Sequence, residues 1–173
     1  MHGALKEDDR RDYEIFKELK ELYKLELERA DKLNDKAIGL VSSSGVVSAL
    51  YVGMGTFALE RISRENQYYP YLVFFLMLGL LLLVLTIVSG LSAYSLSSYR
   101  GTNPHEFIEE YKESKWIELI RYYGGDIGNA TLVNRKENDK KVRGIRFATF
   151  SLTGGSLAII AYIIIMLFSL FGL

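Results

Sequence analysis

Three long runs of the sequence contain no Asp, Glu, Lys or Arg, whereas charged residues fill most of the rest. These runs are Ala37–Leu59, Gln67–Tyr99 and Phe147–Leu173. The hydrocarbon core of a bilayer is about 30 Å thick, and a helix needs about 20 apolar residues to cross it. Each run is long enough, so the pattern predicts an all-α membrane protein with three transmembrane helices.

The pattern also predicts where each part of the chain begins and ends. Transmembrane helices are expected over residues 37–59, 71–96 and 147–172. A short external loop is expected over 60–70, and residues 1–36 and 97–146 are expected to form two or three cytosolic helical segments.

The N-terminal segment has the pattern of an amphipathic helix. From Glu7 to Lys36 it contains no Pro or Gly, and apolar residues recur on one helical stripe. The stripe is made of Ile15, Leu19, Leu22, Tyr23, Ala30, Leu33 and Ala37. Glu26 interrupts it, which we interpret as a semi-exposed position. No breaker precedes the first span, so we expect one long helix from the cytosol into the membrane.

A second cytosolic helix is expected to begin at Asn103-Pro104-His105-Glu106, where Asn103 caps the helix and Pro104 takes its first position. We expect this helix to stop at Gly124-Gly125. Asp126 is then expected to cap a further helix that continues into the third span.

Composition narrows the function classes. The chain has 173 residues, with 21 basic and 21 acidic side chains, so the net charge is zero. A nucleic-acid partner, which needs a clustered basic face, is not expected. The absence of cysteine excludes disulfides, thiolate metal sites and thiol nucleophiles. No catalytic, phosphate-loop or metal-ligand pattern is present, so we expect no enzyme, no cofactor and no metal.

Basic residues predict the orientation, because short positively charged loops stay in the cytoplasm. Nine Lys and Arg precede the first span, two lie in the first loop, Arg61 and Arg64, and ten lie between Arg100 and Arg146. This places the N-terminus inside and the C-terminus outside a multi-pass protein of the cell (inner) membrane.

The first span differs from the other two because it is rich in small and weakly polar residues. Gly45, Ala49 and Gly53 recur every four residues, a spacing that lets helices approach closely in lipid. A neighbouring strip of the same helix contains the candidate pore-lining residues, which are Ser44, Ser48 and Gly55. Two interpretations stay open: this span lines a pore shared by several copies, or it packs tightly inside the monomer.

Short stretches next to the spans resemble those of known proteins. Leu33–Ala37 precedes the first span, and Leu132–Lys136 and Lys140–Val142 precede the last. This layout resembles the prokaryotic SLATT and Pycsar-type transmembrane effector families. The resemblance implies a membrane-perturbing defence effector that forms oligomeric pores in response to a nucleotide second messenger. Since the chain has no recognisable sensor domain, the signal is expected to arrive through a cytosolic sensor protein or through the cytosolic helices.

The sequence therefore favours a homo-oligomeric membrane pore or ion channel of four or more copies, gated through its cytosolic helices. Its partners are the lipid bilayer and further copies of the chain. The alternative is a membrane-anchored scaffold or signalling subunit whose cytosolic helices bind a protein partner. A transporter is disfavoured because no acidic side chain lies within a span.

Overall fold

A computed structural model describes residues 7–95, 101 and 115–171 of the chain, and the described residues contain helices and no strand. The helices are α1 (Glu7–Arg61), α2 (Tyr69–Ser95) and α4 (Trp116–Phe171). All three are long and apolar enough to cross a membrane. The expected all-α class with three membrane-length helices is confirmed at this level of length and composition.

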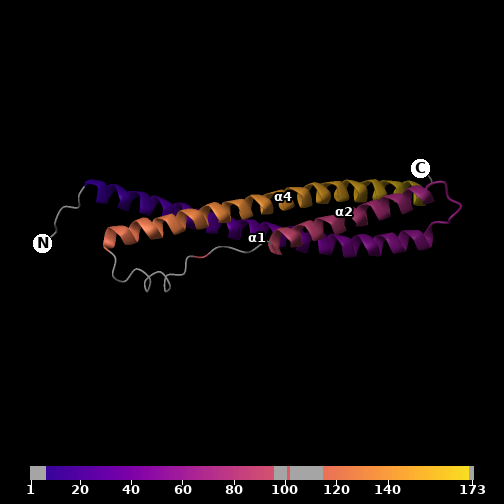
Figure 1. Ribbon diagram of the computed structural model, residues 1–173. Coiled ribbons are helices and arrows are strands. Elements are labelled where there is room, and N and C mark those ends of the chain that lie inside the picture. The colour runs from indigo at the N-terminus through magenta and orange to yellow at the C-terminus, as the bar shows by residue number, and fades with distance from the viewer. Residues whose placement is uncertain (1–6, 96–100, 102–114, 172–173) are drawn as a thin grey trace. The chain divides into compact units, whose positions relative to one another are not determined.

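The chain divides into two compact units. Unit 1 comprises Met1–Lys32 and Leu96–Lys140, and unit 2 comprises Leu33–Ser95 and Lys141–Leu173. Both α1 and α4 contribute to each unit, whereas α2 belongs to unit 2. Figure 1 shows the three helices with their labels.

Unit 2 is a bundle of three helices with α2 antiparallel to its neighbours. Gly90 lies against Val41 near one end of the bundle, and Gly79 lies against Tyr51 further along. The residue numbers fall along α2 as they rise along α1, so the two helices are antiparallel. The core consists of Tyr51, Ala58, Ile62, Leu72, Leu76, Leu83 and Tyr162. Buried glycines adjoin this core at Gly55, Gly79, Gly90 and Gly155, and such small residues let helices approach closely where burial in lipid gives little drive for association.

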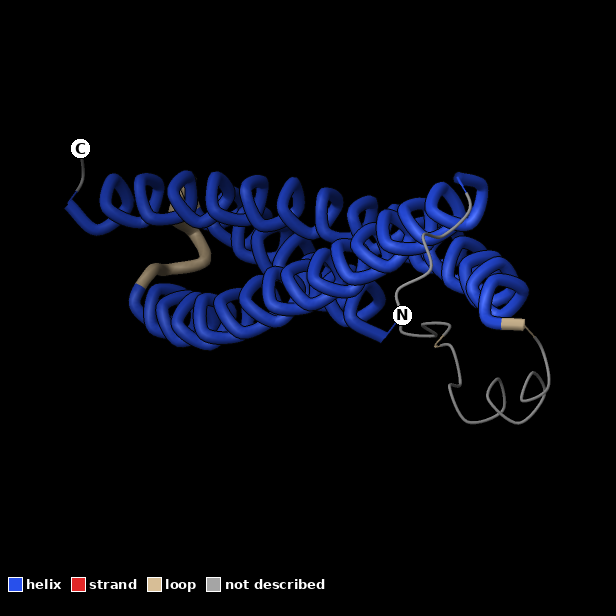
Figure 2. Tube along the Cα trace, turned by 90° about the vertical axis from the view of Figure 1, so that its left-hand side faces the viewer, coloured by secondary structure: helices blue, strands red, loops and turns tan. Residues whose placement is uncertain are grey.

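The connection between α1 and α2 is short and hydrogen-bonded to itself. The Asn66 side chain accepts a hydrogen bond from the backbone N–H of Tyr68 at 2.8 Å, and the Asn66 backbone oxygen accepts one from Tyr69 at 3.0 Å. Pro70 follows in the first turn of α2. Backbone N–H groups in a first turn have no acceptor within the helix, so the proline, which lacks an N–H, costs no hydrogen bond there. Figure 2 shows this connection as a tan loop between two helices.

Two predictions about helix continuity have opposite outcomes. The predicted unbroken helix from the N-terminal segment into the first span is confirmed, since α1 runs from Glu7 to Arg61. The predicted stop at Gly124-Gly125 is wrong, because α4 runs through both glycines, and Asp126 lies inside the helix rather than capping one. The predicted start at Asn103 lies outside the described residues.

The Gly124 environment explains why the helix does not end there. Glycine costs a helix about 1 kcal/mol relative to alanine, which is too little to end a long packed helix by itself. Gly124 is buried, and a Cβ built on it would lie 3.7 Å from Leu19 and 3.8 Å from Phe16 of α1. These are ordinary van der Waals distances, so an alanine would also fit here, and the packing of α4 against Leu19 and Phe16 supports the helix through this position.

Candidate functional site

Two buried tyrosines join the three helices of unit 2. Tyr51 of α1 donates a hydrogen bond to the backbone oxygen of Phe75 in α2, with the two oxygens 2.8 Å apart. Tyr162 of α4 packs edge-on against the Tyr51 ring, with 5.4 Å between the ring centroids. The Tyr162 hydroxyl lies 3.5 Å from the backbone oxygen of Gly55 in α1. Each tyrosine therefore links its own helix to a neighbour.

Two glycines provide the space that this arrangement needs. A Cβ built on Gly79 would lie 2.5 Å from the Tyr51 ring, and one built on Gly55 would lie 2.5 Å from the Leu76 side chain. Neither position accommodates a side chain without movement of its neighbour. The contact of α1 with α2 depends most on Gly79, because the Tyr51 ring is held by its hydrogen bond, whereas the end of the Leu76 side chain can rotate away from Gly55.

A buried layer of hydroxyl groups crosses the same bundle. Its members are Ser44, Thr86 and Ser151, one from each helix, exposed by 0%, 0% and 6%. Because Val41 meets Gly90 and Tyr51 meets Gly79, Ser44 of α1 and Thr86 of α2 lie at the same level. Thr86 donates to the backbone oxygen of Leu82 at 2.9 Å, while the Ser44 Oγ has no hydrogen-bond partner among the described residues.

The candidate pore-lining residues lie on or beside the inner face of α1. Ser44 is fully buried, and Gly55 is buried against Leu76 of α2. Ser48 is half-buried, and its hydroxyl donates to the backbone oxygen of Ser44 at 2.7 Å. Within a single chain, these residues serve contacts inside unit 2.

The candidate packing residues lie on the exposed side of α1. Gly45, Ala49 and Gly53 are all exposed. A Cβ built on Gly45 or Gly53 would have no neighbouring atom within 4 Å among the described residues. Their small size is therefore not explained by contacts within the described part of the chain.

Each helix of unit 2 presents an outward row of exposed residues, spaced alternately three and four apart. The outward row of α1 is Gly39, Ser42, Val46, Ala49, Gly53 and Thr56. The outward row of α2 is Phe74, Met77, Leu81, Val84, Val88 and Leu91. The outward row of α4 is Phe150, Thr153, Leu157, Ile160, Ile164 and Leu167. The rows of α2 and α4 suit contact with acyl chains, whereas the row of α1 contains a single large apolar side chain, Val46; Leu50 and Phe57 are exposed on a neighbouring row of α1.

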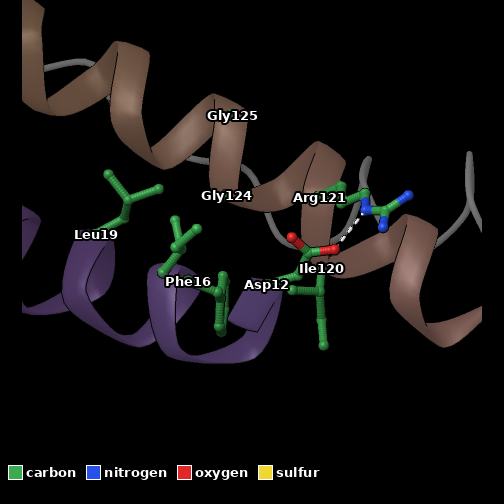
Figure 3. A pocket seen from close by; sticks show the side chains of 8 residues that line it. Asp12, Phe16, Leu19, Ile120, Arg121, Gly124 and Gly125 are labelled. Carbon is green, nitrogen blue, oxygen red and sulfur yellow. Dashed lines mark hydrogen bonds and ion pairs between the residues drawn. The ribbon is translucent and has the colours of Figure 1, made fainter. Parts of the chain in front are cut away.

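Unit 1 contains a shallow groove between α1 and α4, with a volume of about 220 Å³. Phe16 and Leu19 line it from α1, and Ile120, Gly124 and Gly125 line it from α4 (Figure 3).

An ion pair closes the charged end of this groove. The Arg121 Nε donates to the Asp12 carboxylate at 2.6 Å, and this hydrogen bond raises the pKa of the arginine. Arg121 is more than half exposed, so the pair orients the two helices but contributes little to stability. The groove offers no catalytic pair and no buried charge.

A second polar cluster in unit 1 is better buried. Asn138 of α4 is fully buried, and its amide donates to the backbone oxygen of Glu26 at 2.9 Å and to the Glu26 carboxylate at 2.8 Å. Arg29 lies 3.4 Å from that carboxylate and donates to Asp139 at 2.9 Å. The hydrogen bond with Asp139 is the main cause that raises the pKa of Arg29. Glu26 is thus a structural link between α1 and α4.

At its Leu33 end, unit 2 holds a buried cation. Lys141 of α4 is fully buried, and its Nζ donates to the Asn34 side-chain oxygen of α1 at 2.7 Å. The sequence interpretation did not single out Lys141, Asn138 or the two tyrosines. A signal was present, because Asn134, Asn138 and Lys141 recur at the spacing of one helical face.

No group of His, Cys, Asp or Glu able to hold a metal ion exists among the described residues. Comparison with family models, curated proteins and solved structures gives no match. The site must therefore be interpreted from its own chemistry.

Proposed function

We propose that the chain is the subunit of a homo-oligomeric membrane pore or ion channel of the cell membrane, formed by four or more copies. In this proposal the N-terminus and the segment between α2 and α4 are cytosolic, and the C-terminus is external. The proposal rests on the contrast between the outward row of α1 and the outward rows of α2 and α4.

The outward row of α1 suits contact with protein or water better than contact with lipid. Its residues are small, and helices in lipid associate through small residues that allow close backbone contact. A ring of copies with α1 innermost turns this row away from lipid, toward the axis and the neighbouring copies, and turns the large side chains of α2 and α4 toward lipid.

This arrangement assigns the lining to residues on the outward row of α1, and it leaves Ser44 and Gly55 inside each subunit. Ser42 and Thr56 are exposed and carry hydroxyl groups. A lining of hydroxyls and backbone carbonyls without a charged ring gives weak ion selectivity. Gating in this proposal passes along α1 and α4, because each helix has residues in both units.

The test is conductance of the purified chain in planar bilayers, together with its mass in detergent. Ala49→Leu enlarges the outward row of α1, and Thr153→Leu makes a similar enlargement on the outward row of α4. We expect Ala49→Leu to abolish the ring and the current and Thr153→Leu to leave both unchanged. A well-folded oligomer that passes no current would refute the pore, and equal effects of the two variants would refute the assignment to α1.

A membrane-anchored scaffold is the second candidate, and one observation favours it. Ile15, Leu22 and Leu25 are 48%, 51% and 59% exposed on α1 in unit 1. An apolar row of this kind suits a protein partner. A pulldown that retains a cytosolic protein in fixed ratio, combined with silent bilayers, would favour the scaffold over the pore.

A further inference from the structure

Two exposed arginines of α4 lie beside the apolar surface of unit 2. Arg143 and Arg146 are three residues apart, so they lie on one side of the helix with about 5–6 Å between their Cβ atoms. Neither makes an ion pair or a hydrogen bond with a described residue. Their charges are therefore available to a partner outside the chain.

The residues that follow on the same side are large and apolar. Phe147 is 53% exposed and Phe150 is 77% exposed, and both lie within two turns of the arginines. The helix therefore presents two cations followed by two aromatic rings. A phospholipid has the same order, with a phosphate group followed by acyl chains.

The opposite end of unit 2 is different. There Arg61 lies over the ring of Phe57, with 5.3 Å between the guanidinium carbon and the ring centroid. Glu60 and Glu65 lie near Arg61 and Arg64 in the sequence, so the positive charges are balanced. Among the described residues of unit 2, the end that contains Arg143 and Arg146 is the one with an excess of unpaired positive charge beside exposed aromatic residues.

We propose that Arg143 and Arg146 form a binding site for the headgroup phosphate of an anionic phospholipid, whose acyl chains lie against Phe147 and Phe150. Guanidinium groups bind phosphate oxygens through paired, charge-assisted hydrogen bonds. Basic residues beside a membrane surface each contribute about 1 kcal/mol of attraction to anionic lipid. The site requires that α4 crosses the membrane, and it is independent of whether copies form a pore.

The experiment measures lipid retained by the purified full-length chain in native mass spectrometry, after exchange into equal amounts of phosphatidylglycerol and phosphatidylcholine. We expect wild type to prefer phosphatidylglycerol by a factor on the order of ten. Arg143→Gln/Arg146→Gln should reduce that preference to about onefold, because both cations are removed. The matched control, Arg61→Gln/Arg64→Gln, should retain the wild-type preference.

Two further arms make the result decisive. Inorganic phosphate added in excess should not displace the lipid, because the site also needs acyl chains, and displacement would overturn the assignment to a phospholipid. Arg143→Lys/Arg146→Lys keeps the charge and should lower the preference only in part. No preference in wild type would overturn the proposal even if the glutamine variant does not fold, and so would an unchanged preference in a folded glutamine variant.

Discussion

The ring of Tyr51 occupies the space opposite Gly79, and this allows its hydroxyl to reach the Phe75 backbone oxygen at 2.8 Å. The Tyr51 ring fits against α2 because Gly79, which lies one helical turn from the acceptor residue Phe75, has no side chain. Tyr51 itself is only 1% exposed, so the pair lies in the core of unit 2. The contact is specific to these two positions because both the ring and the missing side chain are needed.

Gly79→Ala is therefore expected to destabilise unit 2. The new methyl group would lie 2.5 Å from the Tyr51 ring, so the ring must move and its hydrogen bond to Phe75 is strained or lost. Overpacking of this kind costs about 1–3 kcal/mol. Thermal unfolding in detergent, followed by helical circular dichroism, measures the change.

Gly53→Ala is the matched control for this substitution, because a Cβ on Gly53 has no neighbour within 4 Å among the described residues. Under conditions that keep the chain monomeric, this variant should be as stable as wild type or slightly more stable, since alanine favours helix by about 1 kcal/mol. Equal destabilisation by Gly53→Ala and Gly79→Ala would show that the Tyr51 contact is not responsible.

The hydrogen bond between Lys141 and Asn34 leads to a second prediction. Asn34→Leu removes the side-chain oxygen that lies 2.7 Å from the buried Lys141 ammonium group. Loss of a hydrogen bond to a charged group costs about 1.5–3 kcal/mol. The free energy of unfolding in detergent should fall by this amount, whereas Asp35→Ala, at an exposed neighbouring position, should leave it nearly unchanged.

A double substitution separates the lost hydrogen bond from a general loss of packing. Asn34→Leu/Lys141→Met replaces the buried polar pair by apolar side chains, a change that is often neutral or stabilising. We expect the double variant to recover most of the stability lost in Asn34→Leu. A double variant less stable than either single variant would exclude the lost hydrogen bond of the lysine as the cause.

The sequence was sufficient to predict the helices that dominate the fold. Runs without charged residues and the unbroken pattern before Ala37 predicted membrane-length helices and the continuity of α1. The continuation of the helix through Gly124-Gly125 was not predictable from propensity, because it is supported by packing near Leu19 and Phe16 of another helix. Helix propensity gives the free-energy cost of a glycine in a helix, but it does not include the tertiary contacts that offset this cost.

The small residues of the first span show the same limit at the candidate site. Periodicity placed Gly45, Ala49 and Gly53 on one stripe and Ser44 near another, but it did not tell which stripe faces α2 and α4. That choice is made by Tyr51, whose size and hydrogen bond direct one side of α1 toward the core. Sequence spacing defines faces, and the partner helices decide how each face is used.

The cluster around Asn138 leads to a third prediction. Glu26→Ala removes the carboxylate that accepts hydrogen bonds from both Asn138 and Arg29. Asn138 is fully buried and keeps its hydrogen bond to the Glu26 backbone oxygen, so the variant loses one hydrogen bond to a charged group, which should cost about 1.5–3 kcal/mol. Amide hydrogen exchange should become faster for the α1 residues of unit 1, while Glu28→Ala, which removes an exposed ion pair with Lys24, should cause little change.

Because the pKa of Arg29 is raised, the stability of this cluster should not depend on pH in the neutral range. A raised arginine pKa contributes stability that is present below the ordinary arginine value and is lost only as pH rises through the raised value. Arg29 therefore stays charged through neutral and mildly alkaline pH. The loss of protection in Glu26→Ala relative to wild type at the same pH should persist across that range, and a difference that disappears on mild alkalinisation would contradict a charged Arg29.

The absence of cysteine from the chain allows a direct test of which outward row meets a second copy. Single cysteines at Ala49 or Gly53 place a thiol on the outward row of α1. If this row faces its own copies, mild oxidation in membranes should give disulfide-linked dimers, because the Cα atoms of paired cysteines must lie within about 7 Å.

Cysteines at Met77 and Ile160 test the outward rows of α2 and α4, and these variants should remain monomeric. A cysteine at the buried Ser44 should also remain monomeric. Crosslinking at Met77 or Ile160 in place of Ala49 and Gly53 would move the interface between copies away from α1 and refute the proposed lining.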